Sequence, residues 1–307
     1  MNLCIFVVTA ATLLSPVFGH EAPEGSVGVP LGSTGASEPG VAAGTSQAEH
    51  RVWLGADGKE LPFKTDEEIL EFLKTAELLD TENIPVGVTA PKRALLEQDG
   101  IQAHATFKDI DDTAKRVRLS DGTRVMELRD FYMFEYAAYE LSLLLGLDNV
   151  PPTVIRKPGR SEGSLQMWIE NAMTESERLE KGLQSPDIIG WRRQVQVMYL
   201  FDDLIGNVDR NAGDIVIDSD WKLWMIDHSR SFQYRFEPKR FAEVIYVERG
   251  FWERLQALSE GQIRERMGNA LTGPEIEGTL ERRDIIVAHI QKLIAERTED
   301  VVLYDRQ

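Results

Sequence analysis

The chain has 307 residues and one cysteine, Cys4, which lies in a short apolar segment at the N-terminus. Without that segment the chain has no thiol, which excludes disulfides, cysteine nucleophiles and thiolate metal sites. Basic residues are also scarce, because 34 Lys and Arg stand against 51 Asp and Glu and give a formal net charge of −17. Such an acidic surface repels nucleic acid and anionic lipid, so neither is expected as a partner.

The N-terminus lacks charge. Residues Met1–Gly19 contain no charged side chain, and Leu3–Leu14 form an apolar run that Pro16 follows. The run is too short to span a bilayer comfortably, which favours a cleaved signal peptide over 1–19 rather than a membrane anchor. The alternative is a short apolar segment of some other use. We therefore expect a protein that is secreted, periplasmic or in the lumen of the secretory pathway, with no stable membrane anchor after cleavage.

The next segment, 20–50, lacks large apolar side chains and is rich in Gly, Ala, Ser and Pro. It cannot bury enough surface to offset the entropy lost on ordering, so it is predicted to be a disordered linker. Beyond it, strand patterns with few helices are typical of residues 51–180, and helical patterns dominate 181–307. This order predicts an α+β, two-lobed fold with a strand-rich N-lobe, a helical C-lobe and a cleft between them.

Local signals place the elements of the first lobe. Thr65 with Glu68 three residues later forms a capping box that predicts a helix from residue 66. Asp99-Gly100 is a tight hairpin signal, and Gly146 is expected to end a helix. The predicted strands are 84–89, 93–98, 101–107, 151–156 and 164–169, and the predicted helix before Gly146 is 129–145.

In the second lobe, a helix over 188–205 ends at Gly206, and a strand pair follows over 214–217 and 223–226. Helices are expected from there to the C-terminus, including 274–299. The polar loop Asn207–Asp214 lies between the long helix and the strand pair, and Asp227 follows the second strand directly. Buried strands that flank polar loops hold carboxylates on a rigid scaffold, where binding and catalytic groups are common.

Phosphoryl transfer needs one carboxylate near the attacking hydroxyl and others that hold a divalent metal ion against the triphosphate. Asp209 and Asp214 are five residues apart, which is the spacing between the catalytic Asp and a metal-binding residue in kinase catalytic loops. Asp227, after a short β-hairpin, fits a second metal ligand. In the first lobe, Lys108 ends an alternating strand, and Glu135 lies among apolar helix residues, where a lone carboxylate is costly. An ion pair between these two side chains explains both placements.

The run Asp209-Arg210-Asn211 with Asp214, followed by Ile226–Phe232 (IDHSRSF), resembles the atypical kinases. Within them it is similar to the HipA-like, phosphoinositide 3-/4-kinase-like and Golgi secretory-pathway kinase groups, over roughly residues 84–232. Those groups use a D-R-x-x-x-[N/E/D] loop and a metal-binding Asp that opens a D-x-x-[KR]-x-F-like segment.

The resemblance implies ATP binding and a role for each matching residue. Asp209 is the implied catalytic base or hydroxyl-orienting residue, and Asp214 and Asp227 are the implied ligands of Mg²⁺ or Mn²⁺. Lys108 is expected to contact the phosphates and Glu135 to pair with it. The implied interlobe hinge beside adenine contains three further residues, Gln166, Trp168 and Glu170.

Two positions depart from the family pattern. Asp214 stands where most kinases carry Asn, although the secretory kinases also use an acidic residue there. The loop 86–92, which would cover the phosphates, has one glycine, and Lys92 and Arg93 at its end are candidates to assist.

Simpler interpretations stand beside these. Asp209 and Asp214 can serve as turn residues, Lys108 can be an exposed strand-end lysine, and Glu140 is an alternative to Glu135. His228 is expected to be a hydrogen-bond partner of the site rather than a metal ligand. The remaining structural expectations are a cap by Asn207, an ion pair between Arg210 and a loop carboxylate, and a solvated helix over 175–180.

Three functions follow from these patterns. The first is an ATP- and metal-dependent kinase whose acceptor is a hydroxyl group on an unknown protein, lipid or small molecule. The second is a pseudokinase that serves as a nucleotide-binding or scaffolding module. The third is a metal-dependent hydrolase, in which the Lys108–Glu135 pair has no role.

Overall fold

The computed structural model describes residues 52–84, 91–119, 122 and 124–306. All of them belong to one unit, Ala48–Gln307. The predicted signal peptide and linker, and nearly all of the predicted strand 84–89, lie outside the described residues. The division into lobes at residue 180 stays a prediction.

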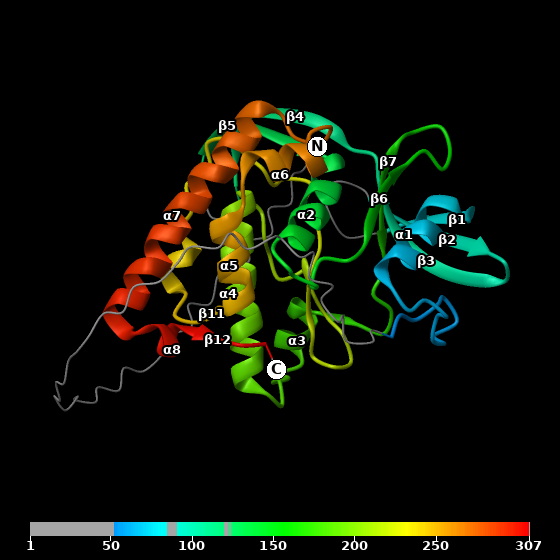
Figure 1. The fold of residues 1–307 in the computed structure, drawn as a ribbon. Coiled ribbons are helices and arrows are strands. Elements are labelled where there is room, and N and C mark those ends of the chain that lie inside the picture. The colour runs from blue at the N-terminus through cyan, green and yellow to red at the C-terminus, as the bar shows by residue number, and fades with distance from the viewer. Residues whose placement is uncertain (1–51, 85–90, 120–121, 123, 307) are drawn as a thin grey trace, which may run out of the picture. The chain divides into compact units, whose positions relative to one another are not determined.

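Strands dominate the first half of the described chain and helices the second (Figure 1). The strands are β1 (Glu77–Asn83), β2 (Lys92–Gln98), β3 (Ile101–Lys108), β4 (Asp111–Arg118), β5 (Arg124–Phe131), β6 (Thr153–Arg156), β7 (Gly163–Met167), β8 (Met173–Thr174), β9 (Ile215–Ile217), β10 (Leu223–Met225), β11 (Val247–Glu248) and β12 (Leu303–Tyr304). The helices are α1 (Asp66–Thr75), α2 (Met133–Leu144), α3 (Glu175–Glu180), α4 (Ile188–Ile205), η1 (Arg240–Glu243), α5 (Arg249–Ala257), α6 (Glu260–Met267), α7 (Gly273–Arg297) and α8 (Glu299–Val302).

A five-stranded sheet in the order β1-β2-β3-β7-β6 carries the lysine of the site. The β2–β3 hairpin turns at Asp99 and Gly100, whose φ angles of 53° and 81° are the left-handed values that such a turn requires. Helix α1 begins with the predicted capping box of Thr65 and Glu68 and packs with the sheet in one apolar cluster. The hairpin and this helix start are therefore confirmed.

The predicted helix 129–145 starts too early. Helix α2 begins at Met133, and Arg129–Phe131 are instead the end of β5, which pairs with β4 in a separate two-stranded sheet. Strands β1 and β4 are almost wholly exposed, so their sequences show no alternation of apolar and polar residues. The sequence patterns missed both strands for that reason.

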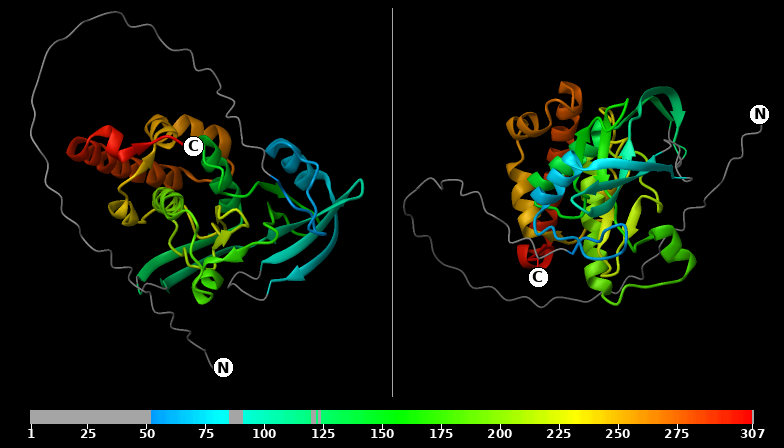
Figure 2. Two further views of the ribbon diagram at one scale, coloured as in Figure 1. Left: turned by 90° about the horizontal axis from the view of Figure 1, so that it is seen from below. Right: turned by 90° about the vertical axis from the view of Figure 1, so that its right-hand side faces the viewer.

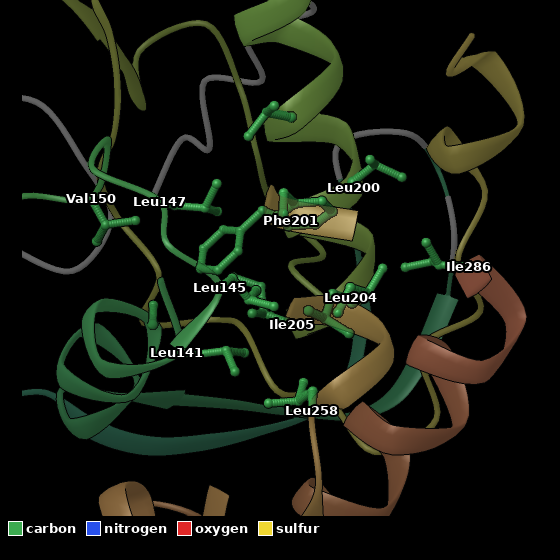
Figure 3. Close-up of a cluster of buried hydrophobic side chains, with 14 of the residues drawn as sticks. Leu141, Leu145, Leu147, Val150, Leu200, Phe201, Leu204, Ile205, Leu258 and Ile286 are labelled. Atoms are coloured by element: carbon green, nitrogen blue, oxygen red, sulfur yellow. The ribbon is translucent and has the colours of Figure 1, made fainter. Parts of the chain in front are cut away.

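Helix α4 spans the predicted 188–205 and ends at Gly206, which has a φ of 61°. Its buried face packs with α2, α5 and α7 in the larger of the two apolar clusters. Figure 3 shows part of this cluster, where Leu141 and Leu145 lie with Phe201 and Leu204. The helix thus provides a rigid support for the polar loop that follows it.

The predicted strand pair after α4 is confirmed as β9 and β10, which form a three-stranded sheet with β8. Helix α3 buries none of its residues, as expected for a solvated helix. Within the described residues, no helix combines the length and the apolar character needed to cross a membrane.

Candidate active site

Lys108, the last residue of β3, makes two ion pairs with carboxylates from the second half of the fold and from α2. Its Nζ lies 2.5 Å from Glu135 Oε1 and 2.8 Å from Asp227 Oδ1, and the lysine is 7% exposed. Burial alone would lower the pKa of Lys108, but the carboxylates of Asp227 and Glu135 outweigh it and hold this pKa above its ordinary value. The lysine is therefore a fixed cation between two carboxylates.

Glu135 occupies the first turn of α2 and is 1% exposed. Burial alone would raise its pKa, but the charge of Lys108 and the contact with His228 lower it. The backbone N–H of His228 donates to Glu135 Oε1 at 3.0 Å, and Nε2 of the buried imidazole lies 3.1 Å from Arg210 Nη2. Both contacts fit the predicted role of hydrogen-bond partner. The alternative residue, Glu140, instead pairs with Arg266.

Asp227 has a φ of 59°, a left-handed conformation that costs free energy in a residue other than glycine. Strain of this kind persists at functional positions when the surrounding structure enforces it. Here β10 ends at Met225, and the N–H of Ile226 donates to the carbonyl oxygen of Asp214 at 3.1 Å. This bond places Asp227 directly beside the end of the polar loop.

Asp214 is the second carboxylate at this position. Burial, followed by the nearby charge of Asp227, raises the pKa of Asp214 from 3.8 to about 8. Its Oδ2 accepts hydrogen bonds from the N–H and side-chain amide of Asn211 at 3.0 and 2.6 Å. A divalent cation bound beside Asp214 would relieve the repulsion that the charge of Asp227 exerts on the ionised Asp214 carboxylate.

Arg210, which is buried, holds the polar loop 207–214 in place. Its guanidinium pairs with Asp202 of α4 at 2.9 Å and donates to the carbonyl oxygens of Asp214 and Ile226. The sequence predicts that Arg210 pairs with a carboxylate of the loop. The structure corrects this prediction, because the Arg210 side chain points toward α4 and pairs with Asp202. Asn207, the expected cap, donates to Asp202 and accepts from the N–H of Asp209.

Asp209 contacts Arg230 rather than Lys108. Its Oδ2 lies 2.6 Å from Arg230 Nη1, and Arg230 Nε donates to Asp130 of β5 at 2.7 Å. Burial raises the pKa of Asp209, and Arg230 partly offsets this rise. Arg230 thus holds Asp209 in place, and Asp130 in turn holds Arg230.

The three proposed hinge residues lie on β7 or just after it. The side chain of Gln166 is buried and donates to Thr153, while Glu170 pairs with His104 at 2.5 Å. Arg93 covers the ring of Trp168 at 4.9 Å. Their role in nucleotide binding stays a prediction, and most of the loop 86–92 lies outside the described residues.

The donors present suit Mg²⁺ or Mn²⁺, which prefer carboxylate oxygens. Among the residues that the structure describes, no group of three or more His, Cys, Asp or Glu side chains could hold a metal ion unaided. Mg²⁺ in nucleotide sites is usually bound by one or two carboxylates together with phosphate oxygens and water. Asp214 and Asp227 fit that incomplete set of ligands.

Three contributors to the site had no role in the predictions from sequence: Arg230, Asp130 and Asp202. Arg230 stands in the quoted IDHSRSF run, so its position was visible although its partner was not. Asp202 carried a signal, since a carboxylate within an apolar helix is costly without a partner. Asp130 carried none, because its contact with Arg230 depends on how β5 packs.

The raised pKa of Asp214 gives a pH-dependent stability. Its folded-state pKa of about 8 lies above the ordinary 3.8, so the folded protein holds a proton that the unfolded chain releases in this window. We therefore expect the contribution of Asp214 to stability to fall as the pH rises from about 4 to about 8. Thermal unfolding in EDTA across this range should show a smaller loss of stability in Asp214→Asn than in the unmodified protein. If the melting temperatures of the two proteins changed equally with pH, the raised pKa of Asp214 would be contradicted.

No protein-family profile matches the sequence, and no curated protein matches it in a sequence search. Solved structures do match the fold. Hydra Fam20, solved with sugar, has a TM-score of 0.59 at 16% identity and covers 78% of this chain and 92% of its own. The Golgi casein kinase gives 0.57 at 14% identity, with 78% of each chain covered. The same kinase with Mn and ADP bound gives 0.56 at 15% identity, over 78% of this chain and 80% of its own. The chain therefore has the α+β fold of the atypical kinases, as the sequence predicted.

Proposed function

We propose that this protein is a phosphotransferase that moves the γ-phosphoryl group of ATP to a hydroxyl acceptor with the help of Mg²⁺ or Mn²⁺. The observation that carries the proposal is the pair of contacts that Lys108 makes with Glu135 and Asp227. These residues are 27 and 119 positions away from the lysine, yet they meet at one buried cation. The similar fold of a kinase that was solved with Mn and ADP bound supports the same conclusion.

Lys108 can bind phosphate without losing its partners. An ammonium group has three N–H donors, and two of them contact Glu135 and Asp227. The third remains for a phosphate oxygen. Asp214 and Asp227 would hold the metal ion, which when bound would neutralise charge on the phosphates.

Asp209 orients the acceptor and takes up its proton. As the acceptor oxygen forms a bond to the γ-phosphorus, the bond from that phosphorus to the β–γ bridging oxygen breaks and ADP leaves with the electron pair. The hydroxyl proton moves to an Asp209 carboxylate oxygen, whose raised pKa makes it a better base than an exposed aspartate. Arg230 fixes the direction of that carboxylate from the other side.

An extracytoplasmic location is part of the proposal. It is supported by the predicted signal peptide over 1–19 and by the Golgi origin given for one structural neighbour. The acceptor class stays open among proteins, lipids and small molecules.

Thermal unfolding with ATP and Mn²⁺ tests the nucleotide site. We expect ATP with Mn²⁺ to raise the melting temperature of the unmodified protein, because binding to the folded state alone stabilises it. The shift should disappear in EDTA and in Asp227→Ala, and it should persist in the exposed-turn control Asp220→Ala. No shift in the unmodified protein would overturn the proposal.

A further inference from the structure

Arg230 lies where strand β5 meets the segment that follows Asp227. The β4–β5 ribbon leaves the five-stranded sheet and runs toward the helical half of the fold (Figures 1 and 2), and its β5 end places Asp130 beside Arg230. The N–H of Phe131 donates to the carbonyl oxygen of Ser229 at 2.8 Å. Strand β5 thus holds both the backbone just before Arg230 and one end of its side chain.

The protein uses only part of the guanidinium group of Arg230. This group has five N–H donors in a fixed fork. Nε donates to Asp130 at 2.7 Å and Nη1 donates to Asp209 at 2.6 Å, so the two carboxylates bind at separate nitrogens. Nη2 lies between these two nitrogens on the fork, and it has no hydrogen-bond acceptor in the part of the chain that the structure describes. Because 22% of the side chain is exposed, Nη2 is left for a ligand.

Orientation of Asp209 alone does not explain why this donor carries a charge. A neutral amide or hydroxyl group could hold the carboxylate in place equally well. Burial raises the pKa of Asp209, and the charge of Arg230 opposes that rise, which makes Asp209 a weaker base than it would be beside a neutral donor. A guanidinium that also stabilises negative charge developing in the reaction would offset this loss.

The proposed reaction brings such a charge within reach. A general base lies about 2.6–3.2 Å from the hydroxyl oxygen whose proton it accepts, and that oxygen attacks phosphorus from about 3–3.5 Å. The γ-phosphoryl group would therefore lie within about 6–7 Å of an Asp209 oxygen. Arg230 Nη1 is already 2.6 Å from Oδ2 of the same carboxylate. Nη2, on the same guanidinium group, is thus within side-chain reach of a phosphoryl oxygen.

We propose that Arg230 is a further catalytic residue whose Nη2 donates to an oxygen of the transferring γ-phosphoryl group, and that Asp130 is the positioning residue that holds it; this rests on the proposed function. The bond from the acceptor oxygen to phosphorus forms as the bond to the β–γ bridging oxygen breaks. ADP leaves with the electron pair, the hydroxyl proton moves to Asp209, and Arg230 gives up no proton. Its charge stabilises the negative charge that spreads over the phosphoryl oxygens in the transition state.

The kinetics of Arg230→Gln test this role. Transfer is measured from radiolabelled ATP to a panel of protein, lipid and small-molecule acceptors that carry hydroxyl groups. We expect kcat to fall about 1,000-fold, as for other arginines that act on a transferring phosphoryl group. KM for ATP and the melting-temperature shift with ATP and Mn²⁺ should stay unchanged, because the contact is made only in the transition state. The control Arg266→Gln removes an arginine that pairs with Glu140 and should keep full turnover.

Chemical rescue separates catalysis from a structural role. Guanidinium ion at a non-denaturing concentration should restore part of the kcat of Arg230→Ala and none of that of Asp209→Asn. Asp130→Ala should lower kcat by about 100-fold, because the guanidinium of Arg230 loses one of its two supports and is misplaced. Asp130→Asn, which still offers an oxygen to Nε, should keep more of the turnover than Asp130→Ala.

Four outcomes would overturn the role of Arg230. Unchanged kcat in Arg230→Gln would mean that the ion pair serves only the fold, and so would a loss of kcat that guanidinium ion does not rescue. A raised kcat would mean that Arg230 blocks Asp209 in the resting protein. Loss of the melting-temperature shift would mean that Arg230 binds ATP before the reaction. In all four the unmodified protein still transfers phosphate, whereas an unmodified protein that transfers none refutes the kinase function and the role of Arg230 with it.

Discussion

Asp209→Asn should lower the turnover of phosphoryl transfer by about 100- to 10,000-fold, which is the usual contribution of a general base. The amide cannot accept the hydroxyl proton, although it preserves the size of the side chain. Arg230 keeps its ion pair with Asp130, so the fold should be little affected. Turnover is measured as transfer of the labelled γ-phosphoryl group from radiolabelled ATP to a panel of protein, lipid and small-molecule acceptors that carry hydroxyl groups.

Binding separates this loss from damage to the nucleotide site. Asp209 does not contact Lys108, so ATP with Mn²⁺ should raise the melting temperature of Asp209→Asn as much as that of the unmodified protein. Asp220→Asn, at an exposed turn, is the matched control and should keep full turnover. If the unmodified protein binds nucleotide but transfers no phosphate to any acceptor tested, it is the binding module that the sequence left open.

Lys108→Met should lower the free energy of unfolding by about 3–5 kcal/mol, because it leaves Glu135 buried without its cation. The double variant Lys108→Met/Glu135→Gln should regain most of that loss. Glutamine is neutral and still offers an oxygen to the N–H of His228. Urea unfolding of the two single variants and the double variant measures the coupling.

Nucleotide binding then distinguishes a functional ion pair from a structural one. We expect neither Lys108→Met nor the double variant to be stabilised by ATP and Mn²⁺, since both lack the ammonium group proposed to bind phosphate. A double variant that is stable and still shows the full nucleotide shift would mean that the pair serves only the fold.

Local sequence signals predicted the parts of the fold that depend on local chemistry. The capping box at Thr65, the turn at Asp99-Gly100 and the helix end at Gly206 each satisfy backbone groups nearby, so a short segment specifies them. Strands β1 and β4 were not predicted, because both of their faces are exposed and their sequences show no alternation of apolar and polar residues.

In the candidate site, too, some features are visible in the local sequence and others depend on how distant segments pack. The spacing of Asp209, Asp214 and Asp227 is visible along the chain, and an unpaired Glu135 in an apolar helix calls for a cation. The contact of Asp130 with Arg230 is different, because it exists only once β5 has packed beside the segment after β10. No local pattern encodes a contact between residues 100 positions apart.

Asp214 and Asp227 are proposed to hold a divalent cation together with a nucleotide next to Lys108. Electron paramagnetic resonance of Mn²⁺ tests it most directly, because the signal of free Mn²⁺ falls when the ion is bound. With ADP present, the unmodified protein and Asp220→Asn should both remove free Mn²⁺ beyond what ADP alone removes, and Asp214→Asn and Asp227→Asn should not. Equal Mn²⁺ binding by Asp227→Asn and the unmodified protein would contradict the claim.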